Sequence, residues 1–207
     1  MYFFLSTDSV NNVNEDTILI SLSYSILDNK YNIILTKSFI LKSDQKQSKE
    51  VNKIIESFNK IHQSQFEYIN QTELYNNLIE DARGCKFLVS HFNDHHTSLV
   101  VDLFDYEHKF ELFKGLINID ILRNSMPFTR IRMHRKGNRL KIPSPKEVYH
   151  WLFNESPNQT NSFFHIPTLI KCFRELDRRG LIPQNYKSID YVDDLVKSKL
   201  NFHISSD

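Results

Sequence analysis

The amino-acid sequence predicts one α/β domain, built on a mixed sheet that joins an antiparallel three-strand meander to parallel strands and is flanked by helices. Three observations predict this fold class. β-rich segments come first, segments with apolar residues at helical spacing follow, and short apolar segments alternate with the later helices. Such short apolar segments are typical of strands that are buried on both faces. With 207 residues, 40% of them hydrophobic, the chain can bury a core without disulfides or a structural metal.

The meander is predicted at the N-terminus. Its three strands cover residues 2–6, 17–27 and 31–41, and Ile18, Ile20 and Leu22 place apolar side chains at alternate positions of the second strand. A polar turn at 28–30 separates the second strand from the third. We therefore expect these strands to pair as antiparallel neighbours.

The rest of the chain alternates between helices and buried strands. Helices are predicted over 48–61, 71–83, 95–113, from Ser144 onward and over 165–179, and buried strands over 85–90 and 116–122. Ser144 is the expected N-cap of its helix, and Gly180 is the expected stop of the last one. Trp151 shares a helical face with Val148 and Leu152 and is expected in the core. The segment between 123 and 143 is expected to be a long polar loop.

The boundaries and the compartment follow from composition. We expect the domain to span 1–183, and 184–207 to form a C-terminal helical extension and tail. The two cysteines, Cys85 and Cys172, fall in core-like segments and are expected to be thiols in a reducing environment. No signal-like N-terminus and no apolar run of about 18 residues is present, so we expect a cytoplasmic protein without a membrane partner.

The strongest local charge lies after the last buried strand. Because the net charge is only +1, binding to nucleic acid must come from a local patch. Seven cations form such a patch: Arg123, Arg130, Arg132, Arg135, Lys136, Arg139 and Lys141. Phe128, Met133 and Leu140 lie among them, a combination that suits phosphates and splayed bases. The alternative is a solvated loop, or one that pairs with Asp102, Asp105, Glu107 and Glu111.

Four segments carry a resemblance to a known family. They are YFFLSTDS at 2–9, FLVSH at 87–91 followed by His95 and His96, PSPKEVY at 143–149, and CFRELDRRGLI at 172–182. In this order and spacing the chain resembles the DnaQ-like exonucleases, the proofreading-type DEDD group of 3'-5' exonucleases, over about residues 1–183. The resemblance implies a ribonuclease H-like mixed sheet.

The resemblance also implies a site for two magnesium ions. In that family an Asp-x-Glu on the first strand, an Asp after a His-Asn motif and a late Asp hold the metals, while a His activates water. The matching positions of this sequence hold Ser6, Asp8, His96, Thr160 and His165. Another register places His165 at the water-activating position and leaves Ile170 at the late Asp. Only Asp8 keeps a carboxylate, whereas magnesium requires hard oxygen ligands.

Three functions follow from this departure. The leading expectation is a catalytically degenerate exonuclease-fold protein that binds single-stranded nucleic acid, 3' ends or a nucleic-acid-processing protein without cutting, and needs no cofactor. The first alternative is an active 3'-5' exonuclease whose site is rebuilt from Asp8, His96 and His165 around zinc, manganese or iron. The second alternative is a protein-docking module without a nucleic-acid ligand.

Overall fold

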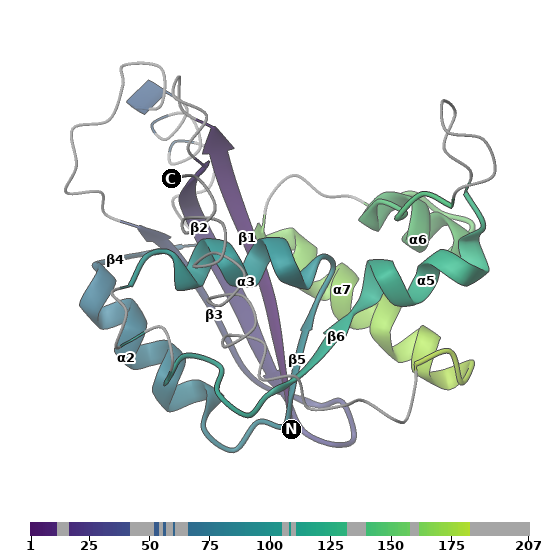
Figure 1. Ribbon diagram of the computed structural model, residues 1–207, viewed down its shortest axis with the longest axis horizontal. Helices are drawn as coiled ribbons and strands as arrows, with labels where there is room; N and C mark the ends of the chain where they lie inside the picture. Colours follow the sequence, from purple (N-terminus) through teal and green to yellow (C-terminus); the bar gives the residue numbers. More distant parts are fainter. Residues whose placement is uncertain are drawn as a thin grey trace, which may run out of the picture.

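The structure is a computed structural model that describes residues 1–11, 17–41, 52–53, 56, 60, 66–104, 108, 111–131, 140–157 and 162–182 (Figure 1). Of the helix predicted over 48–61, only residues 52, 53, 56 and 60 belong to this part, and they are helical. The predicted extension over 184–207 lies outside it.

A six-stranded mixed sheet forms the centre of the molecule. Its strands are β1 (Tyr2–Asn11), β2 (Thr17–Leu27), β3 (Ile33–Leu41), β4 (Glu67–Ile69), β5 (Phe87–Ser90) and β6 (Ile117–Asp120). They lie in the order β4-β3-β2-β1-β5-β6. β1, β2 and β3 pair antiparallel, while β5 pairs parallel to β1, β6 to β5 and β4 to β3. The predicted meander and mixed sheet are confirmed.

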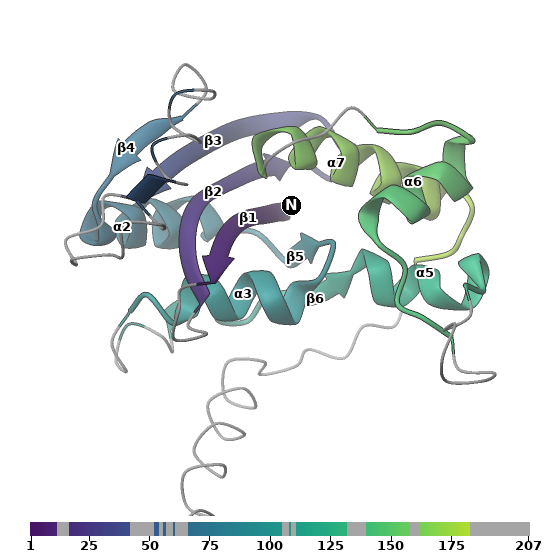
Figure 2. The same cartoon turned by 90° about the horizontal axis from the view of Figure 1, so that it is seen from above.

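Five helices of the described part flank the sheet. They are α2 (Gln71–Ala82), α3 (Asn93–Val101), α5 (Ile121–Thr129), α6 (Pro145–Phe153) and α7 (Ser162–Arg178). Figure 2 shows α2 and α3 on one side of the sheet and α5, α6 and α7 on the other. No helix among the described residues is both long and apolar enough to cross a bilayer.

Each face of the sheet carries its own core, because side chains alternate along a strand. Phe3 and Leu5 on β1 pack in one core with apolar residues of α2 and α3. Phe4, between them, packs in the other core with apolar residues of α5, α6 and α7. β1 therefore supplies both layers and lies at the centre of the fold.

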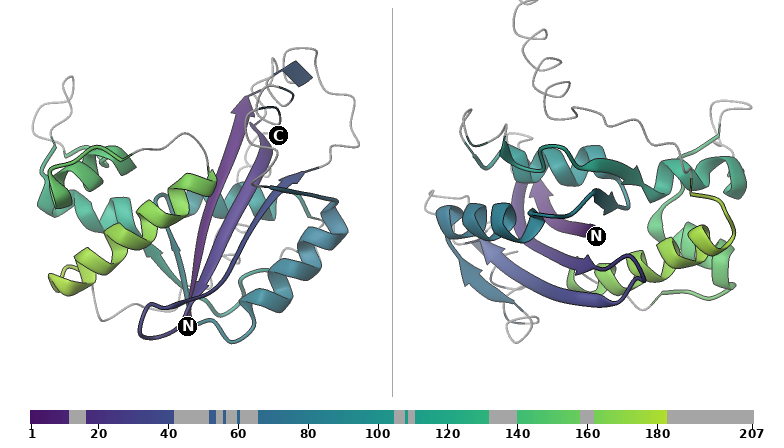
Figure 3. Two further views of the ribbon diagram at one scale, coloured as in Figure 1. Left: turned by 180° about the vertical axis from the view of Figure 1, so that it is seen from behind. Right: turned by 90° about the horizontal axis from the view of Figure 1, so that it is seen from below.

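α7 packs across β1 and β2, as the view from behind in Figure 3 shows. The strand side chains on this face include four fully buried serines, Ser6, Ser21, Ser23 and Ser25. The three serines of β2 alternate with Leu22 and Tyr24, which belong to the opposite core. Small side chains at these positions let the helix approach the sheet closely.

The predicted capping residues are confirmed. The Ser144 hydroxyl accepts a hydrogen bond from the Glu147 backbone N–H at 3.3 Å, and the Glu147 carboxylate accepts one from the Ser144 N–H at 2.6 Å. This reciprocal pair fixes the start of α6. Gly180 has a φ of 67°, the left-handed conformation that ends α7.

The segment after β6 corrects two predictions. The predicted strand over 116–122 ends at Asp120, and the predicted loop begins with α5. The Asp120 carboxylate accepts a hydrogen bond from the Arg123 N–H at 3.0 Å, so it caps the helix directly after the strand. Apolar Ile121 and Leu122 continue the strand pattern across this boundary, which hides the change from one element to the next.

Other boundaries also differ from the predictions. β1 continues to Asn11, because its polar second half is held by backbone pairing with β2 and not by an apolar pattern. α3 ends at Val101, short of the predicted 113, and α7 begins at Ser162, ahead of the predicted 165. The three-residue strand β4 was not predicted.

The core position predicted for Trp151 is wrong. Its side chain is 37% exposed, while Val148 and Leu152 on the same helix are buried. The indole ring stacks on Phe128 at a centroid distance of 6.4 Å, and the Arg179 guanidinium lies 5.3 Å from its centroid. Trp151 therefore lies at the flank of the apolar stripe of α6, covered by α5 and by the end of α7.

Both cysteines are free thiols, as predicted. Cys172 is fully buried in the core beneath α7, and Cys85 is partly buried. Burial raises the pKa of the Cys172 thiol to about 12, so this group is protonated and inert at neutral pH.

Candidate functional site

The predicted site residues gather at the C-terminal half of β1. Ser6 and Asp8 lie on the face of the sheet that α7 covers, because they alternate with Leu5 and Thr7. His165 lies in the first turns of α7, and its Nδ1 is 3.5 Å from the Ser6 Oγ. The fold therefore joins two predicted positions that are 159 residues apart in sequence.

His96 reaches the same strand from α3. Its Nδ1 lies 2.7 Å from the Oγ1 of Thr7, the residue after Ser6. α3 starts immediately after β5, so its first turns lie beyond the carboxyl end of β5 and beside the second half of β1, which continues to Asn11. In open α/β sheets, ligands bind outside the carboxyl ends of the strands.

The electrostatic environment keeps His96 neutral. Burial lowers its pKa to about 3, and the neighbouring His95 and His165 act in the same direction. Burial also lowers the pKa of His165, while the negative charge of Asp8 opposes that shift. At neutral pH the imidazole of His96 is therefore an uncharged hydrogen-bonding group.

Asp8 contributes the negative charge of the cluster. Its Oδ2 accepts a hydrogen bond from the Ser21 hydroxyl on β2 at 2.6 Å. The register between β1 and β2 shifts between Asp8 and Ser9, which marks a β-bulge. Bulges are frequent beside functional sites, where they redirect a side chain. Asp8 is thus held at an irregularity of the strand, within the electrostatic reach of His165.

A third histidine of the cluster, His91, was not predicted as a site residue. It follows β5 and is 2% exposed. Neither of its ring nitrogens has a hydrogen-bond partner within the described part of the chain. Burial holds its pKa well below the usual value, and His165 and His96 add to the shift. The signal in the sequence was its place at the end of FLVSH, one of the four matched segments.

The donor set does not fit a pair of magnesium ions. Among the described positions that the resemblance assigns to metal ligands, Ser6, Asp8, His96 and His165, one side chain is a carboxylate. Two divalent cations about 3.5 to 4 Å apart need several hard oxygen ligands with negative charge. Within the described ranges, no three His, Cys, Asp or Glu side chains are grouped so that they could hold a metal ion.

The structure describes only some of the residues that the two registers of the last motif assign to the site. Thr160, which one register places at the water-activating position, lies outside the described residues. Ile170, which the other register places at the late Asp, is buried in the core beneath α7. His165, in contrast, contacts Ser6. These contacts place His165 within the cluster and Ile170 in a packing role.

Three of the seven predicted basic residues belong to the described part of the chain. Arg123, on α5, forms an ion pair with Asp120 at 3.6 Å. Arg130 is exposed and ends α5 with a left-handed φ of 48°. Lys141 pairs with Glu147 at 2.9 Å. The remaining four, Arg132, Arg135, Lys136 and Arg139, lie outside the described residues.

Comparison with known proteins connects this fold to nucleases. No protein-family profile matches the sequence, and no curated protein matches it. Solved structures do match. The Neurospora crassa Pan2 catalytic unit, which contains a protease and a nuclease domain, aligns with a TM-score of 0.54 and 11% identity over 87% of this chain and 28% of its own.

Two exonuclease structures align in the same way. E. coli exonuclease I in complex with a dA13 oligonucleotide has a TM-score of 0.56 and 8% identity over 95% of this chain and 42% of its own. A full-length 3'-exonuclease has a TM-score of 0.57 and 9% identity over 87% of this chain and 61% of its own. The chain thus spans less than two thirds of each of these proteins. At such low identity the likeness shows the fold, which is the ribonuclease H-like α/β fold of exonucleases.

Proposed function

We propose that this protein is a catalytically degenerate exonuclease-fold protein that binds single-stranded nucleic acid, including 3' ends, or a nucleic-acid-processing partner, without cutting. The observation that carries the proposal is the contact between Ser6 and His165. The resemblance assigns Ser6 to a carboxylate that holds metal, and one of its two registers assigns His165 to another, whereas here a hydroxyl and an imidazole lie against each other. A cytoplasmic location is part of the proposal, supported by the two free thiols.

The chemistry of the cluster supports binding without hydrolysis. Phosphodiester cleavage by two metals needs cations that activate water and stabilise the leaving oxygen. Ser6, His96 and His165 offer neutral donors and acceptors instead, and His96 stays neutral because burial lowers its pKa to about 3. The imidazoles of His96 and His165, which are partly exposed, can hydrogen-bond a sugar hydroxyl or a base edge without binding magnesium.

The basic segment supplies the expected contact with phosphates. Arg130 is exposed at the end of α5, and four further cations follow before residue 140 in the sequence. Each phosphate that such side chains neutralise releases counterions, so binding should weaken steeply with salt. A protein partner would show a weaker dependence unless its surface were strongly acidic.

The first experiment measures binding and cleavage with the same substrates. End-labelled single-stranded DNA and RNA are titrated with protein between about 50 and 200 mM salt, then incubated with magnesium or manganese. The proposal predicts salt-sensitive binding and intact substrate. Cleavage that disappears in Asp8→Ala would refute the noncatalytic assignment. Absence of binding at low salt would remove the nucleic-acid ligand and leave the protein partner.

A second experiment locates the nucleic-acid surface. Arg132, Arg135 and Arg139 are changed together to Glu, and we expect oligonucleotide binding to be lost with the melting temperature unchanged. The matched control changes three exposed cations elsewhere, Arg83, Lys86 and Lys114, to Glu. Both variants alter the net charge equally, so a loss confined to the first variant assigns binding to the basic segment. Equal losses would mean that only overall charge matters.

One observation favours a second candidate function, an active exonuclease with a rebuilt metal site. Asp8 and His165 interact electrostatically, and the pKa of His165 is lowered by burial and raised by Asp8. Two imidazoles and a carboxylate would suit zinc, manganese or iron, but the three side chains are not grouped closely enough to hold an ion and would have to move together to do so. Metal analysis of the purified protein and melting curves with each ion test it. Bound metal and a thermal shift, both lost in His165→Ala, would favour this candidate over the first.

A further inference from the structure

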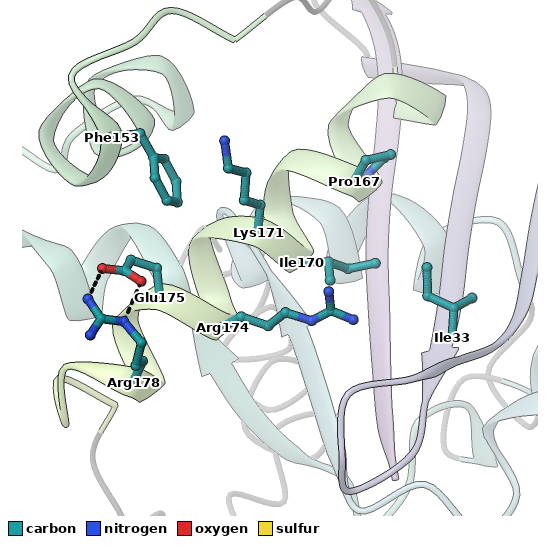
Figure 4. Close-up of a pocket in the computed structure, with 8 residues that line it drawn as sticks. All are labelled: Ile33, Phe153, Pro167, Ile170, Lys171, Arg174, Glu175 and Arg178. Carbon is teal, nitrogen blue, oxygen red and sulfur yellow. Dashed lines mark hydrogen bonds and ion pairs between the residues drawn. The ribbon is translucent and has the colours of Figure 1, made fainter.

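A groove of about 380 Å³ lies on the outer side of α7, away from the cluster described above. Figure 4 shows it between α7, the end of α6 and the start of β3. Its lining residues are Ile33, Phe153, Pro167, Ile170, Lys171, Arg174, Glu175 and Arg178. A volume of this size is sufficient for one or two apolar side chains of a ligand.

The floor of the groove is apolar and continues onto an exposed patch. Ile33 faces α7 in Figure 4, and Ile33 and Ile34 are 57% and 58% exposed. A register shift between Ile26 and Leu27 of β2, opposite this part of β3, places both isoleucines outside the core. Two adjacent exposed β-branched residues beside an apolar groove indicate an interaction surface.

The rim of the groove is basic. Lys171, Arg174 and Arg178 line it with a single carboxylate, Glu175. Glu175 binds Arg178 at 2.7 Å, and Arg174 donates a hydrogen bond to the backbone carbonyl of Tyr31. Lys171 also pairs with Glu155 at 3.6 Å, outside the lining, so the excess of positive charge that is complementary to an acidic ligand rests mainly on Arg174.

The aromatic rings at the groove are not available for stacking. The Lys171 ammonium lies 4.2 Å from the centroid of Phe153 and 4.7 Å from that of Tyr149. It also donates a hydrogen bond to the Tyr149 hydroxyl at 2.6 Å. Recognition of single-stranded bases relies on free aromatic faces. The surface therefore suits aliphatic side chains and carboxylates better than nucleotides.

The adjoining strand offers backbone groups as well. β3 pairs with β2 along its length, whereas β4 pairs only with Phe39, Ile40 and Leu41. Across the described part of the chain, residues 33–38 therefore have no strand on their outer side. Such an edge can accept an extended peptide as an added strand.

We infer that the groove and the free edge of β3 together form a docking site for an extended, acidic segment of a partner protein. Backbone groups of the segment pair with β3, its apolar side chains enter the groove beside Ile33, and its carboxylates face Arg174 and Lys171. This site is separate from the cluster of Ser6 and His165, so it serves recruitment of a partner and does not depend on the proposed nucleic-acid binding.

The test uses the full chain and a labelled peptide of roughly ten residues in which Leu alternates with Asp. We expect saturable binding by fluorescence anisotropy, which weakens by about tenfold in Arg174→Glu and in Ile33→Asp. Arg174→Lys should retain most of the affinity. Lys114→Glu, an exposed charge reversal elsewhere, is the matched control and should bind as the wild type does. Hydrogen exchange should slow at 33–38 when the peptide binds.

Three results would overturn the inference. The first is a lack of saturable binding, and the second is equal binding of a peptide with Lys in place of every Asp. The third comes from labelled dT12 measured on the same variants. If dT12 competes with the peptide and loses affinity in Arg174→Glu, the groove is a phosphate site. If the variants bind the oligonucleotide as tightly as the wild type does, the groove is not the nucleic-acid site. The peptide result then tests only the docking proposal and leaves the proposed nucleic-acid binding untouched.

Discussion

The Oγ of Ser6 lies 3.5 Å from the Nδ1 of His165, across the interface between β1 and the start of α7. Two carboxylates at this separation would repel each other unless cations lay between them. A hydroxyl and an imidazole instead attract without any ion, so this interface is stable as it is. Replacing these two residues by aspartates therefore provides a direct test of the site.

Restoring carboxylates should create a dependence on magnesium. In the triple variant Ser6→Asp, His96→Asp, His165→Asp, three new carboxylates join Asp8 around the second half of β1, and two of them meet at the contact between positions 6 and 165. We expect a lower melting temperature than that of the wild type without metal, and recovery in millimolar magnesium, because the cation neutralises the repulsion. Differential scanning fluorimetry measures both effects.

The matching control is Ser6→Asn, His96→Asn, His165→Asn, which has similar volumes and no added charge. It should show no response to magnesium. If both triple variants respond alike, or if neither does, the assignment of these positions to the metal-ligand positions of the exonuclease fold is wrong.

The histidine cluster should make the protein sensitive to mild acid. The pKa values of His91, His96 and His165 are all lowered in the folded protein, and that of His96 lies at about 3 instead of 6.5. Between the two values the unfolded chain binds more protons, so stability rises with pH and falls as pH drops below about 6.5. For His96 the loss reaches up to about 1.4 kcal/mol per pH unit between its two pKa values, and His91 and His165 act in the same direction.

Urea denaturation between pH 7.5 and 5 measures this loss. The pKa of Glu175 is lowered to about 2 by its two arginine partners, so its contribution is lost only below its ordinary pKa of 4.5 and does not interfere. His150→Gln removes an exposed histidine outside the cluster and should leave the slope unchanged. His96→Asn should reduce it. Equal stability at both pH values would contradict the neutral, buried state of the cluster.

Asp120 should stabilise α5 mainly as its cap. Asp120→Ala removes the oxygen that accepts from the Arg123 N–H and should cost about 1 kcal/mol in the free energy of unfolding. Asp120→Asn keeps a capping oxygen but loses the ion pair with Arg123, whose side chain is half-exposed. We expect this variant to lose less than Asp120→Ala. A larger loss in Asp120→Asn would show that charge outweighs capping.

Trp151 and Phe173 should differ in their contribution to stability. Phe173 is 1% exposed and packs edge-on against Phe4, so Phe173→Ala should cost about 3 to 5 kcal/mol. Trp151→Ala removes a half-exposed ring that stacks on Phe128, and we expect a cost of roughly 1 to 2 kcal/mol. Comparable losses in chemical denaturation would mean that Trp151 belongs to the core after all.

Local patterns in the sequence predicted the mixed sheet and most of the helices that flank it. Alternation along 17–27, the short apolar segment at 85–90 and the cap at Ser144 each reflect interactions within a few residues, so each is visible in the sequence. α5 was missed because Ile121 and Leu122 prolong the apolar strand, and only the capping bond of Asp120 separates strand from helix.

The cluster could be predicted only in part. The matched motifs predicted that Asp8, His96 and His165 would lie near one another, and the fold brings them to the second half of β1, with Asp8 and His165 on the face toward α7 and His96 at Thr7 on the other face. The role of Thr7 as a partner of His96 depends on which face of β1 meets α3, and no local pattern specifies that. His91 belongs to the histidine cluster because it is buried, and the burial of a residue depends on the assembled fold and not on its neighbours in sequence.

The serines beneath α7 have a consequence for the evolution of the site. Ser23 and Ser25 are not matched to any metal-ligand position, although Ser23 lies opposite Ser6 on the neighbouring strand, and their small size lets the helix that carries His165 approach the sheet. An added methyl group at either position would lift α7 and separate His165 from Ser6, while every residue of the cluster stayed the same. The distance between His165 and Ser6 can therefore be changed by substitutions that no comparison of site residues alone would detect.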